Sequence, residues 1–215
     1  MTPPTRAHSD FSTRCNRPQV FALLQYLVFL GAIIQLVGVL SYIRGTLRGE
    51  TKPNRVTWLL WGVIPIIATG AAWIDGVRWA ALPVFMAGLG PLLIFAFSFV
   101  NQNAYWKLGR LDYVCGLFSV GAIILWAVTK APAAAIILSI IADALAAAPT
   151  LIKAWHQPET EKIGPYLAGF ISQLTAMAAF KLFTLSEIAF PIYLLIINAT
   201  LFLIIKRNTL FKLSR

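Results

Sequence analysis

The chain has 215 residues, of which 59% are hydrophobic and only 12% are charged, and its formal net charge is +10. So few charged side chains leave too little polar surface to cover a soluble globule of this size, which excludes an ordinary water-soluble protein. Because the basic residues lie in short segments between apolar stretches, where they act as orientation signals, we expect the lipid bilayer as a partner and no nucleic acid.

Seven stretches of the chain carry almost no charge and define the predicted elements. In chain order they are 18–43, 56–74, 79–106, 113–129, 131–152, 163–180 and 188–205, and only Asp143 interrupts one of them. A bilayer core needs about 20 mainly apolar residues per helix, with a range of about 17 to 25. Strands are excluded because an open sheet edge in lipid leaves backbone groups unpaired, and the segments lack the alternation of barrel strands. The sequence predicts an all-α polytopic membrane protein with seven transmembrane helices.

Lysine and arginine residues are unequally divided between the two sides of these helices. The side that holds the N-terminus carries six of them, and the opposite side carries twelve. The more basic side is expected in the cytoplasm, so the sequence predicts an N-terminus outside and a C-terminus inside. Because the chain has no recognisable retention or sorting signal, we expect a bacterial inner (plasma) membrane.

The first three predicted helices resemble the last three at an offset of about 109 residues. Tyr42-Ile43-Arg44-Gly45 runs on to Glu50-Thr51 as Leu151-Ile152-Lys153-Ala154 runs on to Glu159-Thr160, and Leu82-Pro83-Val84-Phe85 corresponds to Phe190-Pro191-Ile192-Tyr193 at an offset of 108. Because the offset covers four helices, both copies enter the membrane from the same side, which predicts parallel repeats joined by a linker helix. The predicted domains are a polar tail at 1–18, a first repeat at 19–106, the linker helix at 107–130, a second repeat at 131–207 and a basic tail at 208–215.

This 3+1+3 arrangement resembles the SWEET and PQ-loop superfamily over residues 19 to 207. The sharpest local element, Ala148-Pro149-Thr150-Leu151-Ile152-Lys153, is similar to a PQ-loop segment in which Thr150 replaces the glutamine, and the first half has Leu40 and Ser41 at the equivalent place. The resemblance implies a transporter with its substrate site near the midplane between the halves. It also implies hinge prolines in each repeat, a role that Pro149 and Pro165 match in the second half.

Four residues at membrane depth are candidates for binding a solute. Asp143 is the acidic residue well inside a span, where a charged group costs at least about 2.5 kcal/mol, so it is either a cation or proton site or a structural pin. Asn198 lies mid-span in the last helix, where the resemblance implies a sugar-binding Asn, but its first-half counterpart is Gly90. Gln173 is expected to line the pathway, and Trp61 is expected to stack on the ligand. Other polar residues at this depth are expected mainly to bond across helices, namely Gln35, Thr69, Ser172 and Thr175.

The sequence offers no poised acid, base or metal site of the kind that an enzyme needs. His8 and His156 lie outside the spans, the two cysteines have no metal-binding spacing, and Glu159 and Glu161 are expected in a solvated loop. We therefore predict neither catalysis nor a cofactor. The predicted function is transport of a small polar solute, a sugar or an amino acid, by alternating access between the repeats. The alternative is a non-transporting receptor, sorting or structural protein on the same fold; proton coupling and homo-oligomerisation stay open.

Overall fold

The computed structural model describes residues 17–104, 106–129, 132–180 and 184–213, so most of the predicted polar tail at 1–18 lies outside the described residues. Within these ranges all regular secondary structure is helical, which confirms the predicted all-α class. The elements are α1 (Arg17–Leu47), α2 (Arg55–Ile74), a short 3-10 turn η1 (Trp79–Ala81), α3 (Leu82–Phe97), α4 (Arg110–Thr129), α5 (Pro132–His156), a second turn η2 (Pro158–Thr160), α6 (Gly164–Ala178) and α7 (Leu185–Leu213).

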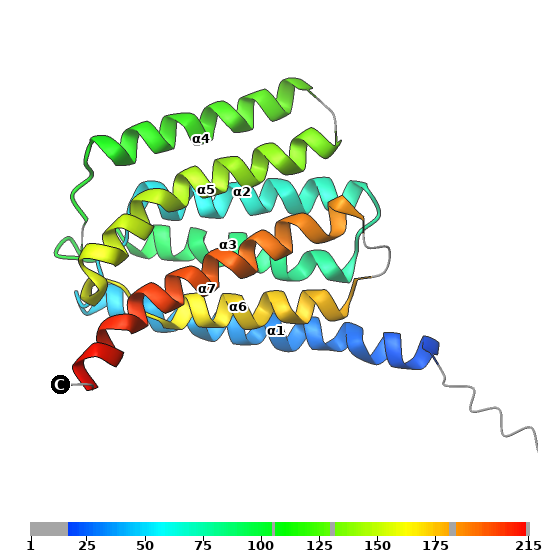
Figure 1. Ribbon diagram of the computed structural model, residues 1–215, viewed down its shortest axis with the longest axis horizontal. Coiled ribbons are helices and arrows are strands. Elements are labelled where there is room, and N and C mark those ends of the chain that lie inside the picture. The colour runs from blue at the N-terminus through cyan, green and yellow to red at the C-terminus, as the bar shows by residue number, and fades with distance from the viewer. Residues whose placement is uncertain (1–16, 105, 130–131, 181–183, 214–215) are drawn as a thin grey trace, which may run out of the picture.

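Five of the described helical segments are long and apolar enough to cross a bilayer. They are Tyr26–Leu47, Arg55–Ile74, Trp79–Phe97, Ile136–His156 and Glu187–Arg207. The seven α-helices lie side by side with their axes roughly parallel, and the described start of α1 and the end of α7 lie at opposite ends of the bundle (Figure 1). Length and composition of these helices indicate an integral membrane protein.

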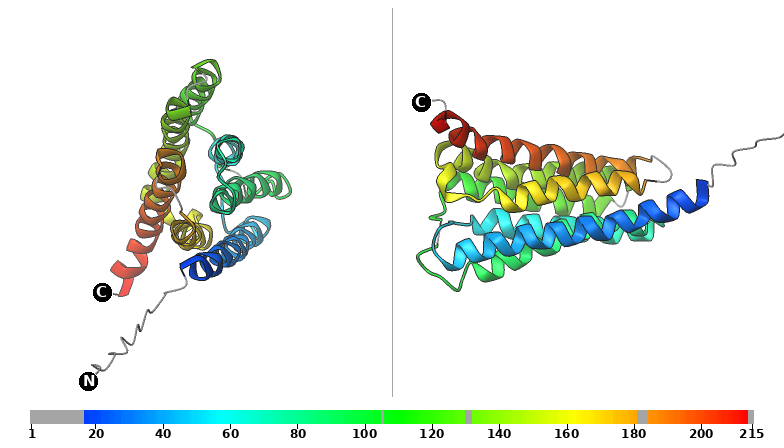
Figure 2. Two further views of the ribbon diagram at one scale, coloured as in Figure 1. Left: turned by 90° about the vertical axis from the view of Figure 1, so that its right-hand side faces the viewer. Right: turned by 90° about the horizontal axis from the view of Figure 1, so that it is seen from below.

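Contacts between the helices follow a regular pattern. In the first half α3 packs against both α1 and α2, and in the second half α7 packs against both α5 and α6. Between the halves, α1 packs along α6 and α2 packs along α5. α4 contacts mainly α5 and lies at one edge of the bundle in the end-on view (Figure 2). The other six helices therefore surround a shared centre.

The interface between α1 and α6 brings two backbones close together because small residues line it. A Cβ atom on Gly38 would lie 2.5 Å from the Cβ of Ala168 and 2.7 Å from the carbonyl oxygen of Gly164. A Cβ atom on Gly31 would overlap the hydroxyl of Thr175. Close backbone approach through small residues is the usual way in which membrane helices gain dispersion energy. Glycine at these two positions therefore fixes how near α1 can come to α6.

One end of the bundle, which we call the basic end, is where α1, α3, α5 and α7 finish. There Asn54 caps α2 by accepting hydrogen bonds from the backbone N–H groups of Val56 and Thr57. The Asn54 amide also donates to Asp112 in the first turn of α4, and Asp112 accepts a 2.5 Å bond from the N–H of Gly109. An N-cap of this kind stabilises a helix by about 1 kcal/mol. Because Asn54 is fully buried, the cap also fixes α2 relative to α4.

Candidate functional site

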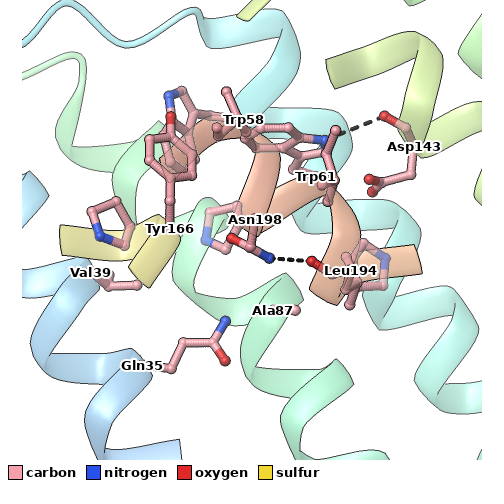
Figure 3. Close-up of a pocket in the computed structure, with 14 residues that line it drawn as sticks. Gln35, Val39, Trp58, Trp61, Ala87, Asp143, Tyr166, Leu194 and Asn198 are labelled. Carbon is pink, nitrogen blue, oxygen red and sulfur yellow. Dashed lines mark hydrogen bonds between the residues drawn. The ribbon is translucent and has the colours of Figure 1, made fainter. Parts of the chain in front are cut away.

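A cavity of about 50 Å³ lies where the helices of both halves meet, and a water molecule needs about 10–15 Å³ of such space. It therefore has room for about three waters or one compact solute in this conformation. Figure 3 shows its lining side chains, which come from all helices except α4. The polar and aromatic members of the lining are Gln35 from α1, Trp58 and Trp61 from α2, Asp143 from α5, Tyr166 from α6 and Asn198 from α7.

Asp143 is the carboxylate of this lining, and its side chain is almost completely buried at 1% exposure. The hydroxyl of Tyr193 on α7 donates a 2.8 Å hydrogen bond to its Oδ2, whereas its Oδ1 has no hydrogen-bond partner among the described residues. The indole N–H of Trp61 donates to the Asp143 backbone carbonyl at 3.4 Å. A buried carboxylate oxygen without a donor is costly. We therefore expect this atom to bind a cation, a proton or a solute.

Two side-chain amides reach the same cavity from α7 and α1. Asn198 donates its amide N–H to the carbonyl oxygen of Leu194 at 2.8 Å, which identifies the other terminal atom, Oδ1, as a free acceptor. A Cβ atom on Gly169 would lie 2.7 Å from this oxygen, so the absence of a side chain on α6 makes room for it. Gln35 is 6% exposed and reaches toward Asn198 (Figure 3), and its Oε1 also lacks a partner in the described part of the chain.

Three aromatic rings form the wall of the cavity at the basic end. The ring centroids of Trp58 and Trp61 lie 5.5 Å apart in an edge-to-face arrangement. The ring of Tyr166 lies 6.3 Å from Trp58 and 6.4 Å from Trp61. Such pairs add about 0.5–1.5 kcal/mol beyond their area burial. The three rings therefore pack into one continuous aromatic wall of the cavity.

Behind this wall lies a buried polar group, the end cluster, formed by Tyr42, Lys153, Glu161 and Tyr166. Lys153 and Glu161 form an ion pair with side-chain exposures of 1% and 0%. Glu161 Oε2 accepts hydrogen bonds from the Tyr42 hydroxyl at 2.9 Å and from the Tyr166 hydroxyl at 2.8 Å. Lys153 also donates to the carbonyl oxygen of Lys52 in the α1–α2 loop. The end cluster thus joins α1, α5, α6 and that loop at the basic end.

The end cluster corrects one prediction from the sequence. Glu161 was expected in a solvated loop together with Glu159, but it is buried, with 5% of the whole residue exposed. Glu159 is exposed, as expected. The prediction was wrong for Glu161 because its partners, Lys153 and Tyr42, come from other helices that the local sequence does not reveal.

Three of the four predicted binding residues line this one cavity, namely Trp61, Asp143 and Asn198. Gln173 is not among the lining residues: it is fully buried, and its amide N–H donates to the carbonyl oxygen of Pro83 at 3.4 Å. Its Oε1 has no partner among the described residues. A role of Gln173 in binding stays a prediction.

The two predicted hinge prolines occupy different positions in their helices. Pro149 lies inside α5, where proline removes a backbone donor and favours a kink. Pro165 lies in the first turn of α6, where proline is tolerated because that N–H has no helical partner, and it also lines the cavity. Their action as hinges stays a prediction.

Sequence reasoning missed the parts that Gln35, Tyr166 and Tyr193 take in this site. Gln35 was expected to bond across helices, although its position at membrane depth was a usable signal. Tyr193 is the last residue of the repeated element Phe190-Pro191-Ile192-Tyr193, in which the first half has Phe85. The hydroxyl that distinguishes Tyr193 from Phe85 is the group that bonds Asp143. A polar difference between two otherwise matching apolar elements was therefore a signal for the site.

Neither a metal-binding cluster nor a similar known protein assigns a function to this site. Among the described residues no group of three or more His, Cys, Asp or Glu side chains could hold a metal ion. The assignment of function therefore depends on the geometry and chemistry of the cavity. No protein-family model, curated protein or solved structure matches the chain.

Proposed function

We propose that the chain is a membrane transporter that moves a small polar solute, such as a sugar or an amino acid, by alternating access between two three-helix repeats. The observation that carries this proposal is the cavity, which helices of both halves line and which contains buried acceptor atoms without donors. Each buried polar group left unsatisfied costs about 1–3 kcal/mol. A purely structural membrane protein gains nothing from unsatisfied buried groups. In a solute site the cost is offset, because the solute supplies the missing partners.

The helix contacts support the proposed 3+1+3 arrangement. α3 contacts α1 and α2 as α7 contacts α5 and α6, and the pair α1–α6 corresponds to the pair α5–α2. Two parallel repeats related by an axis along the membrane normal would produce this pairing, with α4 as the linker between them. The SWEET and PQ-loop superfamily, which the sequence resembles, is built on the same plan, and its substrate sites lie between the halves.

The end cluster supports a closed basic end. The buried ion pair between Lys153 and Glu161 and the bond from Lys153 to the Lys52 carbonyl link the α1–α2 loop to the start of α6. Alternating access requires these contacts to separate when the cavity opens to this side. We propose that the basic end lies on the cytoplasmic side of a bacterial inner membrane, with the N-terminus outside, because this side has the excess of basic residues.

The position of Asp143 also supports a second part of the proposal, namely that transport is coupled to protons. A buried carboxylate that faces the cavity and accepts one bond from Tyr193 can exchange a proton as the cavity opens. A symporter would then lose its response to a pH gradient when Asp143 is replaced by Asn. A facilitative transporter would show no such response in the unchanged protein either.

The test is uptake of a panel of labelled sugars and amino acids into proteoliposomes that contain the full chain. We expect uptake of at least one member, and at least tenfold slower uptake with Asp143→Asn or Asn198→Ala. Matched controls are Asp75→Asn in the exposed α2–α3 loop and Thr200→Ala on the exposed face of α7, which should transport as the unchanged protein does. Failure of folded protein to take up any member, or equal losses in the controls, would favour a receptor, sorting or structural protein.

A further inference from the structure

The lining of the cavity contains one carboxyl group and no cationic side chain. Asp143 belongs to the lining, and none of the lining residues is a lysine, an arginine or a histidine. Tyr193 gives the carboxylate one neutral hydrogen bond and no charge. Removing an ion from water costs several kcal/mol unless an opposite charge compensates. When Asp143 is ionised, an entering cation supplies this opposite charge, which a neutral solute of the same size cannot do.

The cavity contains three acceptor oxygens without a donor. Asp143 Oδ1 and Gln35 Oε1 have no partner among the described residues, and the Asn198 amide, which donates one N–H to the Leu194 carbonyl, keeps its oxygen and a second N–H. The three residues come from α5, α1 and α7 and line the same cavity (Figure 3). A ligand that fits them brings N–H or O–H groups, because only donors satisfy acceptors.

Some donors of the lining are already committed or directed elsewhere. Trp61 donates its indole N–H to the Asp143 carbonyl oxygen at 3.4 Å, and Tyr166 donates its hydroxyl to Glu161 at 2.8 Å. Figure 3 shows the indole nitrogen of Trp58 directed away from Asn198 and Gln35. The free donors of the lining include the Gln35 amide, the second N–H of the Asn198 amide and the Trp58 indole N–H, which has no partner among the described residues. None of these donors carries a charge, so a sugar gains no charge–charge attraction in the cavity, whereas a cation pairs with the Asp143 carboxylate.

The aromatic wall adds a second attraction for positive charge. The faces of Trp58, Trp61 and Tyr166 carry the negative part of the ring quadrupole, which attracts ammonium and guanidinium groups at short range. A planar guanidinium ion also stacks on such faces while its N–H groups pair with a carboxylate. The wall and Asp143 lie on the same cavity, so a single small ion can contact both.

We propose that the solute of this cavity is a compact organic cation with N–H donors, an alkylammonium or guanidinium ion. The inference rests on the proposed function in one respect, namely that the cavity is the solute site. Its volume of about 50 Å³ restricts the cationic head group to a few heavy atoms in the conformation described. The positive charge faces Asp143, the N–H groups bond to Asp143, Gln35 and Asn198, and the ring faces cover the remainder.

The probe that separates charge from shape is guanidinium, because urea is a neutral planar molecule of nearly the same size. Binding of radiolabelled guanidinium to the purified full chain in detergent is measured with urea, tetramethylammonium and sodium as competitors. We expect saturable binding that urea and sodium leave unchanged and that tetramethylammonium, a cation without N–H groups, displaces weakly. Asp143→Asn should weaken binding at least tenfold, and Asp75→Asn, in an exposed loop, should not change it.

Two further variants keep the test decisive if Asp143→Asn fails to fold. Trp61→Leu removes one ring face and should weaken guanidinium binding several-fold. Tyr193→Phe removes the single donor to Asp143 and should leave binding equal or tighter, because the carboxylate then has a second oxygen to offer. Weaker binding with Tyr193→Phe and unchanged binding with Trp61→Leu would together overturn the proposal.

Failure of this inference and failure of the transporter proposal give different results. Guanidinium that binds in detergent in an Asp143-dependent manner but does not enter proteoliposomes would support the cation site and contradict transport. Uptake of a sugar or of urea, unaffected by Asp143→Asn, would support transport and overturn the cation site. Sodium that competes as well as guanidinium does would also overturn it, because the site would then hold an inorganic cation.

Discussion

The two buried polar regions of this protein differ in how completely their groups are paired. In the end cluster Glu161 accepts from two tyrosine hydroxyls and faces Lys153, which in turn donates to the Lys52 carbonyl. In the central cavity, which α5 also lines, Asp143 accepts a single hydrogen bond and keeps one oxygen without a partner. Tyr166 belongs to both regions, since its ring lines the cavity and its hydroxyl bonds Glu161.

This difference separates a structural role from a functional one. A buried ion pair fixes the arrangement of the helices, and breaking it leaves an isolated buried charge. A buried acceptor without a partner destabilises the empty protein, and a ligand that donates to it removes this cost. The end cluster should therefore respond to mutation in stability, and the cavity should respond in binding and transport.

The largest expected effect follows from removing the charge of Glu161. Glu161→Gln leaves Lys153 buried without a counter-ion, so the free energy of unfolding should fall by about 3–5 kcal/mol. Reversible unfolding in detergent micelles measures it, with Glu159→Gln in the same loop as the exposed control. Replacing both partners by methionine should restore much of the loss. Equal stabilities for Glu161→Gln and Glu159→Gln would show that the end cluster does not hold the helices together.

The next effect tests the room that α6 leaves for Asn198. A Cβ atom on Gly169 would lie 2.7 Å from Asn198 Oδ1, so Gly169→Ala should displace the amide and cost about 1–3 kcal/mol through overpacking. Uptake should fall in the same variant, although the substituted residue offers no polar group. Gly70→Ala is the matched control, because no other atom lies within 4 Å of the position its Cβ would take. Unchanged uptake in Gly169→Ala would show that Asn198 does not take part in the site.

Asp143→Asn should give the opposite pattern to Glu161→Gln. The amide keeps an acceptor for Tyr193 and carries no buried charge, so stability should be unchanged or higher by about 1 kcal/mol. Uptake should nevertheless fall at least tenfold, which corresponds to about 1.4 kcal/mol. Unfolding and proteoliposome uptake are measured on the same preparations. A loss of stability as large as that of Glu161→Gln would make Asp143 a structural pin and erase the distinction between the two regions.

The smallest effect concerns the exposed pair between Lys162 and Glu50 at the basic end, 2.5 Å apart. The hydrogen bond and charge of Lys162 lower the pKa of Glu50 below its usual value. Because the folded-state pKa is the lower one, the stabilisation is present at neutral pH and is lost as the pH falls through the lowered pKa. The stability difference between the unchanged protein and Glu50→Gln should shrink on acidification and in high salt. A difference that is independent of pH would contradict the pair.

The helices were predictable from the sequence where charged residues mark both ends. The predicted span 56–74 agrees closely with α2 (Arg55–Ile74), whereas the predicted span 79–106 extends well beyond α3, which ends at Phe97. The stretch without charge continues past the helix because residues 101–103 of the following loop are polar but uncharged, and Asn101 bonds the Leu47 carbonyl at 2.9 Å. The absence of charged residues does not show where a helix stops.

The sequence predicted residues of the site only through their depth along each helix. Polar or aromatic character at membrane depth identified Asp143, Asn198 and Trp61, which share one cavity. The same criterion favoured Gln173 over Gln35, yet Gln35 lines the cavity and Gln173 bonds the Pro83 carbonyl. The choice between them depends on how each helix is rotated about its axis, and packing against other helices sets that rotation. The burial of Glu161 likewise depends on partners from α1 and α5.

The central claim is that the cavity is a solute site open in turn to both sides of the membrane. Ala87 on α3 lines it and differs from cysteine by one atom, so Ala87→Cys in a background without Cys15 and Cys115 is the least disturbing reporter. The measurement is its modification rate by a small thiol reagent added to either side of proteoliposomes, with Thr200→Cys on the exposed face of α7 as the control. Reaction from both sides, slowed by a transported solute or guanidinium at Ala87→Cys alone, is the predicted result. Reaction from one side only, or no protection by any solute, would contradict it.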